Sequence, residues 1–489
     1  MLKDASYAKR LWLILSGLLA LRLLALFIAP WGLHGDEAQY WAWSREPSFG
    51  YFSKPPMIAW VIGATTSIFG HEEWAVRLTA PFLHIATTSL IFLTGRKLFT
   101  AKIGFWAALI YTLMPAVWLS SYIISTDAVL LLFWALALYS WASFRDGPSW
   151  RYAVLLGVAL GLGLLSKYAM AFFIPVLVFA ALFDAPTRKA LLNLKGLTVL
   201  IIAALCLTPN LMWNAANDFA TISHTAENAN LQKDLFHPQE LARFWFDQLG
   251  VFGLVTFPML ILAFIAVARK SLPSPALWLM GFSALPLLMI SLEALLSRAN
   301  ANWAVTAYVA GPSLVALWAV TSKTRLNILK AGLIIQTTIV LLIAGLATST
   351  QTVDQFGLNN AVKRLRAWPE TTAIVKAKAA EKDYDFIAVD NRLLFYDFEH
   401  YGIGDTPLRM WSLNAAPKHH ADLTRPLPEG QGTVLLVSYY ENYSAYFQED
   451  FASLTASGSV DIPLGPDKIR RLYFYEASGY SRTKRNDRT

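Results

Sequence analysis

The chain has 489 residues, of which 55% are hydrophobic and only 15% are charged, and its mean hydropathy is +0.42. An average soluble domain carries about 25% charged residues, so this composition excludes an ordinary water-soluble protein. The net charge of +8 does not indicate a nucleic-acid partner, because the basic residues are concentrated in short loops between apolar segments. The single cysteine, Cys206, excludes an intrachain disulfide and a cysteine-based metal site.

Apolar segments recur along the first 349 residues, and a membrane span needs about 20 such residues. We expect helices at 11–29, 75–95, 103–120, 126–144, 151–166, 169–184, 193–213, 245–268, 275–296, 303–321 and 328–349. The first segment follows Lys9 and Arg10 without a small-residue cleavage site behind it, so we interpret it as a retained helix. The sequence therefore predicts a multi-pass α-helical membrane protein with about 11 to 13 transmembrane helices.

The basic residues in the short loops predict which side of the membrane each loop faces, because cytoplasmic loops carry more Lys and Arg. One set of loops holds 16 of them: Lys3, Lys9, Arg10, Arg96, Lys97, Lys102, Arg145, Arg151, Arg188, Lys189, Lys195, Arg269, Lys270, Lys323, Arg325 and Lys330. The opposite set holds 7: Arg45, Lys54, Arg77, Lys167, Lys233, Arg243 and Arg298. We therefore expect a cytoplasmic N-terminus and a C-terminal region on the opposite, extracytoplasmic side of the membrane.

Three parts of the chain are expected to lie outside the membrane on the second side. Residues 30–74 form a first loop with two candidate surface helices, Asp36–Arg45 and Met57–Phe69, which we group with the transmembrane domain 1–349. Residues 214–243 form a polar loop. Residues 350–489 alternate strand-like runs (Phe386–Val389, Thr433–Ser438, Arg471–Tyr475) with candidate helices (Asn391–Tyr401, Asn442–Phe451), which predicts a small α/β domain.

The strongest local signal is Gly35-Asp36-Glu37, which directly follows the first span and precedes Tyr51 and Lys54-Pro55-Pro56. An N-cap for the surface helix would explain one of the two carboxylates, and Asp36 is placed to be that cap. It would not explain the adjacent pair. A lysine fixed by two prolines would hold an ammonium at the membrane surface, although a lone lysine there usually contacts lipid headgroups.

Further polar residues are predicted at the same membrane face. Asp127 begins the fourth span after Ser125 and Thr126, where helix capping is the alternative explanation. Lys167 follows the fifth span, and Arg298 and Asn302 precede the tenth. Ionisable groups at this depth are costly and usually face a protein cavity. Carboxylates and cations together favour a site for a hydroxyl-rich substrate that carries phosphate.

Histidines carry less weight in this prediction. His224 and Glu227 share a helical face, and His224 is a candidate for lining the entrance through which an acceptor substrate reaches the site. His71, Glu72 and Glu73 are adjacent and do not share a face, so we expect capping or headgroup contacts there rather than a metal site. His400, His419 and His420 are expected on the surface of the C-terminal domain.

These motifs resemble the C-type (GT-C) glycosyltransferases of the protein O-mannosyltransferase and lipid A aminoarabinose transferase superfamily. The resemblance covers roughly the first 320 residues and is carried by Gly35-Asp36-Glu37, Lys54-Pro55-Pro56 and Ser125-Thr126-Asp127-Ala128. Two further stretches, 209–214 and 300–303, are similar to a bacterial subgroup that decorates lipid A or the lipopolysaccharide core and includes galacturonosyl transferases.

The resemblance implies a periplasmic cavity and a sugar donor linked to polyprenyl phosphate. It implies that Asp36, with Glu37, and Asp127 are catalytic carboxylates and that Lys54 contacts the carrier phosphate; Lys167 and Arg298 are our additions as phosphate partners, with Tyr51 and Asn302 lining the substrate site. Aminoarabinose transferases carry Glu before Lys-Pro-Pro where this chain has Ser53. No metal ligand is therefore assigned, although a divalent cation is compatible with the family.

The sequence thus predicts an integral-membrane glycosyltransferase of lipid A modification or lipopolysaccharide biosynthesis, with a glycolipid acceptor, membrane lipids and no nucleic acid as partners. Alternatives are a lipid or polysaccharide transporter or flippase, and a protein O-glycosyltransferase. Transporters usually show repeats and polar groups in broken helices near the bilayer midplane, and the sequence shows neither clearly. The sequence allows two kinds of acceptor group. If it is a hydroxyl, Asp36 can act as general base; if it is a phosphate, Asp36 would only orient it.

Overall fold

The computed structural model describes residues 2–228, 235–414 and 416–482, so Lys233 of the topology prediction lies outside the described residues. The chain divides into two compact units. Unit 1 comprises residues 1–28, 54–61 and 77–348, and unit 2 comprises residues 29–53, 62–76 and 349–489. The sequence analysis grouped residues 30–74 with the membrane helices, whereas most of that loop forms one compact unit with the C-terminal residues.

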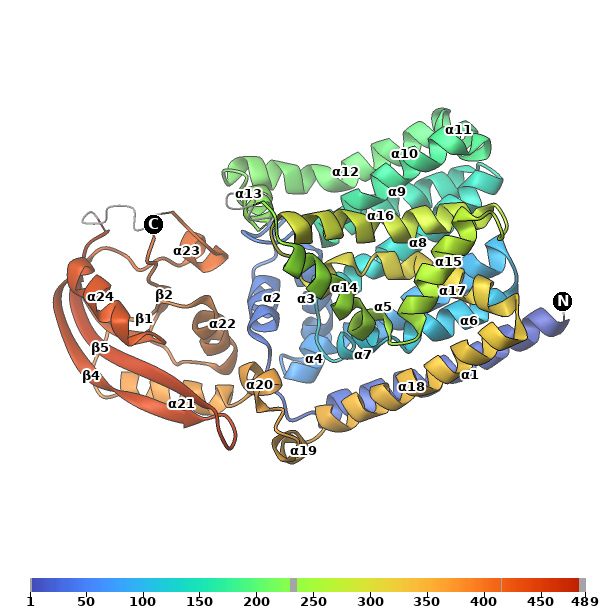
Figure 1. Ribbon diagram of the computed structural model, residues 1–489. Helices are drawn as coiled ribbons and strands as arrows, with labels where there is room; N and C mark the ends of the chain where they lie inside the picture. The colour runs from blue at the N-terminus through green and yellow to red at the C-terminus, as the bar shows by residue number, and fades with distance from the viewer. Residues whose placement is uncertain (1, 229–234, 415, 483–489) are drawn as a thin grey trace. The chain divides into compact units, whose positions relative to one another are not determined.

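Unit 1 is built from apolar helices (Figure 1). They are α1 (Leu2–Ile28), α5 (Thr79–Leu98), α6 (Ala101–Thr112), α7 (Pro115–Leu119), α8 (Thr126–Asp146), α9 (Trp150–Ser166), η1 (Tyr168–Phe172), α10 (Phe173–Phe183), α11 (Ala185–Leu191), α12 (Leu194–Ala216), α13 (Ala220–Glu227), α14 (Pro238–Phe252), α15 (Thr256–Ala268), α16 (Pro275–Leu296), η2 (Ala301–Ala304), α17 (Ala307–Val320) and α18 (Lys323–Ala347). Every segment expected to be a membrane helix is helical, which confirms the helical prediction.

The continuity of these helices differs from the expectation. Among the described residues, six helices are long and apolar enough to cross a membrane, or up to eight if each bent pair counts as one span. The segment expected at 103–120 is interrupted between α6 and α7, where Leu113 ends one helix and Pro115 begins the next. The segment expected at 245–268 bends by 108° between α14 and α15, where Gly253 adopts a φ of +116° that favours glycine.

Glycines allow α9 and α12 to approach each other closely. An added Cβ at Gly157 would lie 2.8 Å from Ile202 Cβ, and one at Gly161 would overlap Cys206, whose Sγ would be 3.0 Å away. Gly157 and Gly161 are four residues apart and therefore lie on the same helical face. Small residues at this spacing let membrane helices pack by close van der Waals contact, which is the main source of association between helices in lipid.

We expect Gly161→Val to separate α9 from α12, because the new side chain overlaps Cys206. Overpacking of this kind costs about 1–3 kcal/mol. The measurement is maleimide labelling of Cys206, the only cysteine in the chain, in detergent-solubilised protein. Labelling should accelerate in the variant. Gly17→Val is the matched control, because nothing lies within 4 Å of a Cβ at Gly17. Equal labelling rates in both variants would contradict this packing.

Unit 2 combines the surface helices with an α/β domain. Its elements are α2 (Gly35–Arg45), most of α3 (Met57–Phe69), α4 (Glu73–Arg77), α19 (Thr350–Gln355), α20 (Asn359–Val362), η3 (Lys363–Leu365), α21 (Trp368–Ala379), β1 (Phe386–Val389), α22 (Arg392–Tyr401), β2 (Leu408–Met410), α23 (His420–Thr424), β3 (Gly430–Ser438), η4 (Glu441–Tyr443), α24 (Ser444–Asp450), β4 (Phe451–Pro463) and β5 (Ile469–Tyr480). The expected surface helices, strands and C-terminal helices are all confirmed, whereas β2, β4 and α21 were not predicted.

The five strands form one mixed sheet in the order β2-β1-β3-β5-β4 (Figure 1). Strand β1 pairs in parallel with β2 and β3, while β5 pairs antiparallel with β3 and β4. Three of the four residues of β1 are buried, as expected for a parallel strand covered on both faces. One face packs on Trp411 and Phe447 in a small core, and Trp411 Nε1 donates a hydrogen bond of 2.8 Å to Asp450.

A carboxyl group is shielded from solvent where β1 and β3 end. Asp390 follows β1 and accepts a short hydrogen bond from Ser438 Oγ at the end of β3. Its second oxygen, Oδ1, is also buried. Burial raises the pKa of Asp390 from its ordinary value of 3.8 to about 7. A carboxyl whose pKa is higher in the folded than in the unfolded chain costs stability increasingly as pH rises from about 4 to about 7.

We therefore expect Asp390→Asn to stabilise unit 2 at pH 8, by on the order of 1–3 kcal/mol, because asparagine cannot ionise but can still accept from Ser438. The measurement is hydrogen exchange of the β1 and β3 amides in the full-length protein at pH 5 and pH 8. The advantage of the variant should shrink towards pH 5. An advantage that grows as pH falls would show that this carboxyl is ionised in the folded protein.

Candidate functional site

The two adjacent carboxylates after the first span have different structural roles. His34, not Asp36, is the N-cap of α2: its Nδ1 accepts from Asp36 N at 3.3 Å. Glu37 Oε2 accepts from His34 N at 2.9 Å and thereby completes a capping box. The side chain of Glu37 is fully buried. The capping alternative was therefore right in kind but wrong in residue, because Glu37 rather than Asp36 closes the helix end.

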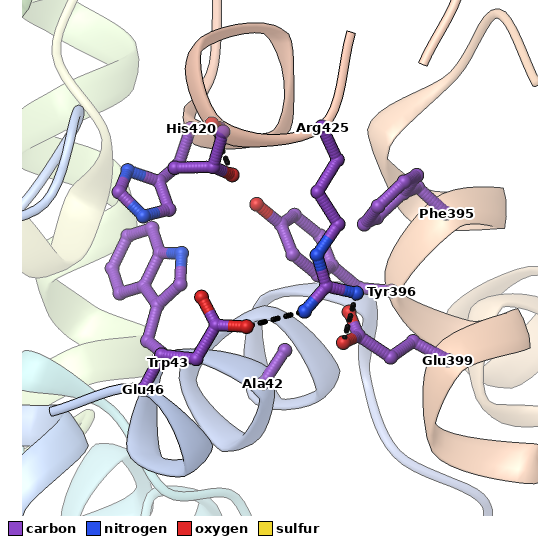
Figure 2. Close-up of a pocket in the computed structure, with 9 residues that line it drawn as sticks. Ala42, Trp43, Glu46, Phe395, Tyr396, Glu399, His420 and Arg425 are labelled. Atoms are coloured by element: carbon purple, nitrogen blue, oxygen red, sulfur yellow. Dashed lines mark hydrogen bonds and ion pairs between the residues drawn. The ribbon is translucent and has the colours of Figure 1, made fainter. Parts of the chain in front are cut away.

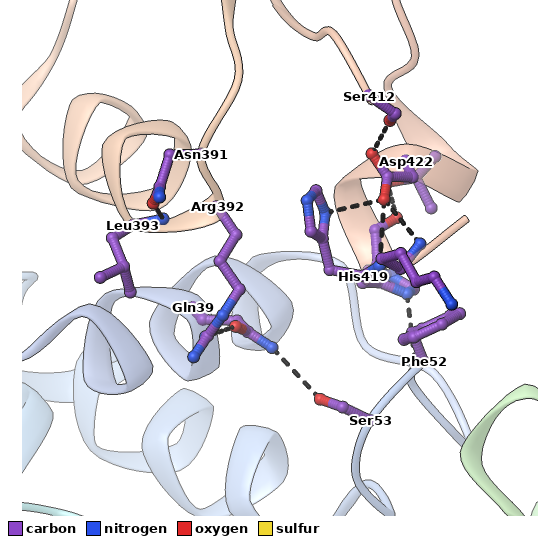
Figure 3. A network of polar contacts seen from close by, with 12 residues as sticks. Gln39, Phe52, Ser53, Asn391, Arg392, Leu393, Ser412, His419 and Asp422 are labelled. Atoms are coloured by element: carbon purple, nitrogen blue, oxygen red, sulfur yellow. Dashed lines mark hydrogen bonds and ion pairs between the residues drawn. The ribbon is translucent and has the colours of Figure 1, made fainter. Parts of the chain in front are cut away.

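Asp36 keeps its carboxylate partly exposed and pairs it with a residue from the C-terminal part of the chain. Arg392 Nη1 donates to Asp36 Oδ1 at 2.8 Å and to Gln39 Oε1 at 2.5 Å. Gln39 is itself buried and donates to Ser53 Oγ at 3.4 Å (Figure 3). Asp36 and Arg392 are 356 residues apart in sequence. This pairing was not predicted, because no local pattern connects the two positions.

Gly35 explains how α22 reaches Asp36. An added Cβ at Gly35 would overlap Leu393 Cδ2 and lie 3.2 Å from Leu393 Cγ. Only a residue without a side chain therefore lets Leu393, the neighbour of Arg392, pack against the start of α2. Asn391 caps α22 by accepting from Leu393 N at 2.9 Å, which fixes the backbone on both sides of Arg392.

Tyr51, predicted to line the substrate site, has a structural role in unit 2. Its hydroxyl donates to Trp43 O at 2.8 Å and accepts from Ser48 N at 3.1 Å, and its ring stacks on Trp43 at 4.5 Å. The ring is 1% exposed, and burial raises the pKa of Tyr51 to about 12. These contacts hold the turn that leads from α2 to Lys54.

A pocket lies beside Trp43, between α2, α22 and α23 (Figure 2). Arg425 crosses it and pairs with Glu399 Oε1 at 2.7 Å and with Glu46. Phe395 and Tyr396 line it from α22. The guanidinium thus links the end of α2 to α22 and to the end of α23. The charged residues of this pocket pair with one another, so their presence does not require a ligand.

The histidines of the C-terminal domain are less exposed than the sequence analysis expected. His400 packs edge-on against Trp41 at 4.5 Å, and His420 packs edge-on against Tyr51 at 5.2 Å. Burial lowers the pKa of His420 to about 4. His71 accepts from Trp41 Nε1 at 3.1 Å, so it holds α2 rather than a metal. Their role is to pack aromatic rings, which a sequence pattern does not reveal.

Unit 1 brings three of the predicted site residues together. Lys167 Nζ lies 2.7 Å from Asp127 Oδ1, and Asn302 Nδ2 donates to Asp127 Oδ2 at 2.7 Å. Asp127 lies in the first turn of α8, where Ser125 is the N-cap without a side-chain cap bond. Asp127 therefore does not serve as the N-cap. Lys167 is the C-cap of α9, and Asn302 lies on η2, so three separate elements meet at one carboxylate.

Neighbouring amides fix two of these elements. Gln248 on α14 is fully buried; its Nε2 donates to Ala301 O at 3.2 Å, and its Oε1 accepts from Tyr308 at 2.6 Å. These bonds hold the segment that carries Asn302. Beside Lys167, the Tyr168 hydroxyl donates to Asn210 Oδ1 at 2.8 Å and accepts from Asn214 at 3.2 Å. The stretch 209–214 singled out in the sequence thus supports the Lys167 segment.

The remaining predicted residues of unit 1 lie on other segments. Lys54 is half-buried in the short 54–61 part of unit 1, Arg298 is exposed between α16 and η2, and His224 is half-buried on α13. Among the described residues, no group of three or more His, Cys, Asp or Glu side chains is placed to hold a metal ion. Ser53, which stands where aminoarabinose transferases have Glu, interacts with Gln39.

Each of these two carboxylates therefore has a cation against it, and an amide takes part in both contacts. Lys167 and Asn302 contact Asp127 directly, whereas Arg392 contacts Asp36 and is itself held by Gln39. A fixed carboxylate can accept a proton from a hydroxyl or stabilise positive charge that develops at a sugar carbon. Sequence reasoning missed Arg392 and Gln248. Asn391 was a visible helix-start signal, but the contact of its neighbour Arg392 with Asp36 depends on the tertiary fold.

The chain is similar to several known proteins. Residues 53–213 match the family model described as dolichyl-phosphate-mannose-protein mannosyltransferase. The lipid A galacturonosyltransferase RgtD of Rhizobium johnstonii is 33% identical over 387 residues, covering 77% of this chain and 79% of the relative. The undecaprenyl phosphate-alpha-4-amino-4-deoxy-L-arabinose arabinosyl transferase 2 of Sodalis glossinidius is 27% identical over about half of each chain.

A solved structure has the same fold. ArnT from Cupriavidus metallidurans, bound to undecaprenyl phosphate, aligns with a TM-score of 0.65 and 16% identity over 95% of this chain and 98% of that chain. The chain belongs to the bacterial GT-C glycosyltransferases and is a multi-pass membrane enzyme with a small C-terminal sheet domain. Membership of this enzyme family replaces the transporter alternative.

We expect Asp127→Asn and Lys167→Met each to lower kcat by about 100-fold or more, because a positioned carboxylate contributes about 10²–10⁴-fold in such reactions. The measurement is initial sugar-transfer rate per folded protein in proteoliposomes. Lys97→Gln is the matched control: Lys97 pairs with Asp146 at 3.3 Å at the opposite end of α8. If Asp127→Asn and Lys97→Gln had the same small effect, the Asp127 cluster would only hold helices together.

Proposed function

We propose that the protein transfers a uronosyl residue, specifically galacturonosyl, from a polyprenyl-phosphate carrier to lipid A or the lipopolysaccharide core. The observation that supports this most is the 33% identity to a lipid A galacturonosyltransferase over more than three quarters of both chains. The fold shared with a transferase bound to undecaprenyl phosphate supports a carrier of that class. A protein acceptor, favoured only by the description of the matching family model, is the second candidate.

In the proposed reaction, the bond between the sugar C1 and the carrier phosphate oxygen breaks, and a bond from C1 to the acceptor oxygen forms. Lys54 contacts the departing phosphate, whose charge grows as the bond breaks, and fixed cations stabilise such charge. The carboxylate of Asp127, held by Lys167 and Asn302, stabilises positive charge at C1. Arg298 is a further phosphate partner, and His224 lines the acceptor entrance.

Asp36 takes the proton if the acceptor is a hydroxyl group. A general base must lie within hydrogen-bond reach of that proton and point towards it. The bond from Arg392, whose guanidinium also donates to Gln39, gives the Asp36 carboxylate a defined orientation in unit 2. Glu37 is not a catalytic group in this proposal, because it is buried and closes the capping box of α2.

We further propose that the protein lies in the bacterial inner membrane with its N-terminus in the cytoplasm and its C-terminal domain in the periplasm. The asymmetry of the basic loops supports this orientation. The shorter apolar helices, such as α9 and α17, add to the six long ones. We infer that α9 and α17 cross the bilayer, as do the two bent pairs and the interrupted segment α6–α7. With the six long helices this gives 11 spans, the lower end of the expected range of about 11 to 13.

The expected result of reconstitution is transfer of labelled galacturonosyl from a polyprenyl-phosphate donor to purified lipid A in proteoliposomes. Asp36→Asn should lower kcat by about 100-fold or more if the acceptor is a hydroxyl. Asp461→Asn, on a β-hairpin of unit 2 where it pairs with Arg471, is the control. If Asp36→Asn transfers sugar at the wild-type rate, Asp36 is not the general base. Label appearing in protein but not in lipid A would favour the second candidate.

A further inference from the structure

Arg392 has an unused hydrogen-bonding edge. Its Nη1 makes both contacts to α2, with Asp36 Oδ1 and with Gln39 Oε1; Figure 3 shows Arg392 beside Gln39. Among the described residues, neither Nε nor Nη2 donates a hydrogen bond, and 39% of the side chain is exposed. The guanidinium presents its Nε–H and Nη2–H on the side away from Nη1, in the spacing that matches two oxygens of a carboxylate or phosphate.

The place of Arg392 in its helix argues against a purely structural role. It is the first residue of α22. A cation there opposes the helix macrodipole, which is unfavourable at an exposed site. An exposed ion pair with Asp36 offsets this only in part. The ion pair itself therefore adds little to the stability of the fold, and the bond to the buried Gln39 holds the guanidinium in place.

The guanidinium is also held in place before any ligand arrives. Gln39 is 3% exposed and accepts from Nη1, Asn391 caps the helix at Leu393, and Leu393 packs on Gly35. An arginine with a fixed backbone and one fixed nitrogen loses little conformational entropy when it binds a ligand. The free energy of binding is therefore more favourable than for a mobile arginine. Its partner Asp36 is the residue proposed to take the acceptor proton.

We propose that the Nε–Nη2 edge of Arg392 binds an oxyanion of the substrate and holds it beside Asp36. This inference rests on the proposed function and names its specificity residue. Two sources have this chemistry: the carboxylate of a transferred uronosyl group, and a phosphate on the glycolipid acceptor. Arg392 bridges this oxyanion and Asp36, so their two negative charges do not meet without a cation between them.

The test compares Arg392→Gln with wild-type protein in proteoliposomes, using substrates with and without each oxyanion. The donor arm uses polyprenyl-phosphate galacturonosyl and polyprenyl-phosphate galactosyl. The acceptor arm uses lipid A and dephosphorylated lipid A. The variant should raise KM by about 10- to 100-fold for the substrate whose oxyanion is bound, the range of a lost charged hydrogen bond. It should change KM by less than about twofold for the matched substrate that lacks this group.

Binding is measured alongside turnover. A substrate that lacks the oxyanion and is not turned over then still gives a binding constant. Free galacturonate and galactose compete with the donor, and inorganic phosphate competes with the acceptor. Loss of inhibition by galacturonate in Arg392→Gln assigns the donor carboxylate; loss of inhibition by phosphate assigns the acceptor. Arg392→Lys should recover only part of the affinity, because an ammonium lacks the two-pronged geometry. Arg471→Gln is the control, since Arg471 forms its own ion pair with Asp461.

The outcomes separate this inference from the proposed function. Equal changes for charged and neutral substrates, with inhibition unaffected, would overturn the oxyanion site and leave Arg392 as a residue that only positions Asp36. Wild-type protein that transfers no galacturonosyl would overturn the proposed function. In that case, binding of the carrier-linked donor and of lipid A to wild type and Arg392→Gln still decides whether the edge binds an oxyanion.

Discussion

An ionised carboxylate that is partly removed from water is stable only if a cation or hydrogen-bond donors compensate its lost hydration. The protein meets this constraint at Asp127 with Lys167 and Asn302 and at Asp36 with Arg392. In both cases the compensating groups come from distant elements of the same unit. The fold therefore has to form around each carboxylate before that carboxylate can act.

The packing of both units serves these contacts. In unit 1, Gln248 holds the segment of Asn302, and Asn210 and Asn214 hold Tyr168 next to Lys167. In unit 2, Gly35 lets Leu393 approach, and the buried Gln39 fixes Arg392. Amides suit this purpose because each offers both a donor and an acceptor without adding a charge. The candidate catalytic groups are thus supported by amide side chains that are themselves buried.

Hydropathy and capping signals predicted the positions of the helices and of Asp36 and Asp127, since both depend on local sequence. The same reasoning could not separate Glu37 from Asp36, because a capping box and a free carboxylate look alike until His34 is seen to cap the helix. Strand β4 was missed because eight of its 13 residues are exposed, and Ser, Thr, Gly and Asp interrupt its apolar residues. The pairing of Asp36 with Arg392 spans 356 residues, and no periodicity reports a contact at that distance.

We have proposed that this glycosyltransferase adds a uronosyl residue to lipid A or the lipopolysaccharide core. Mass spectrometry of lipopolysaccharide from a strain of the native bacterium that lacks the gene tests it most directly. The account predicts that one galacturonosyl residue is lost from lipid A or the core and returns when the wild-type gene is restored. A glycolipid profile identical to that of the parent strain would contradict the claim.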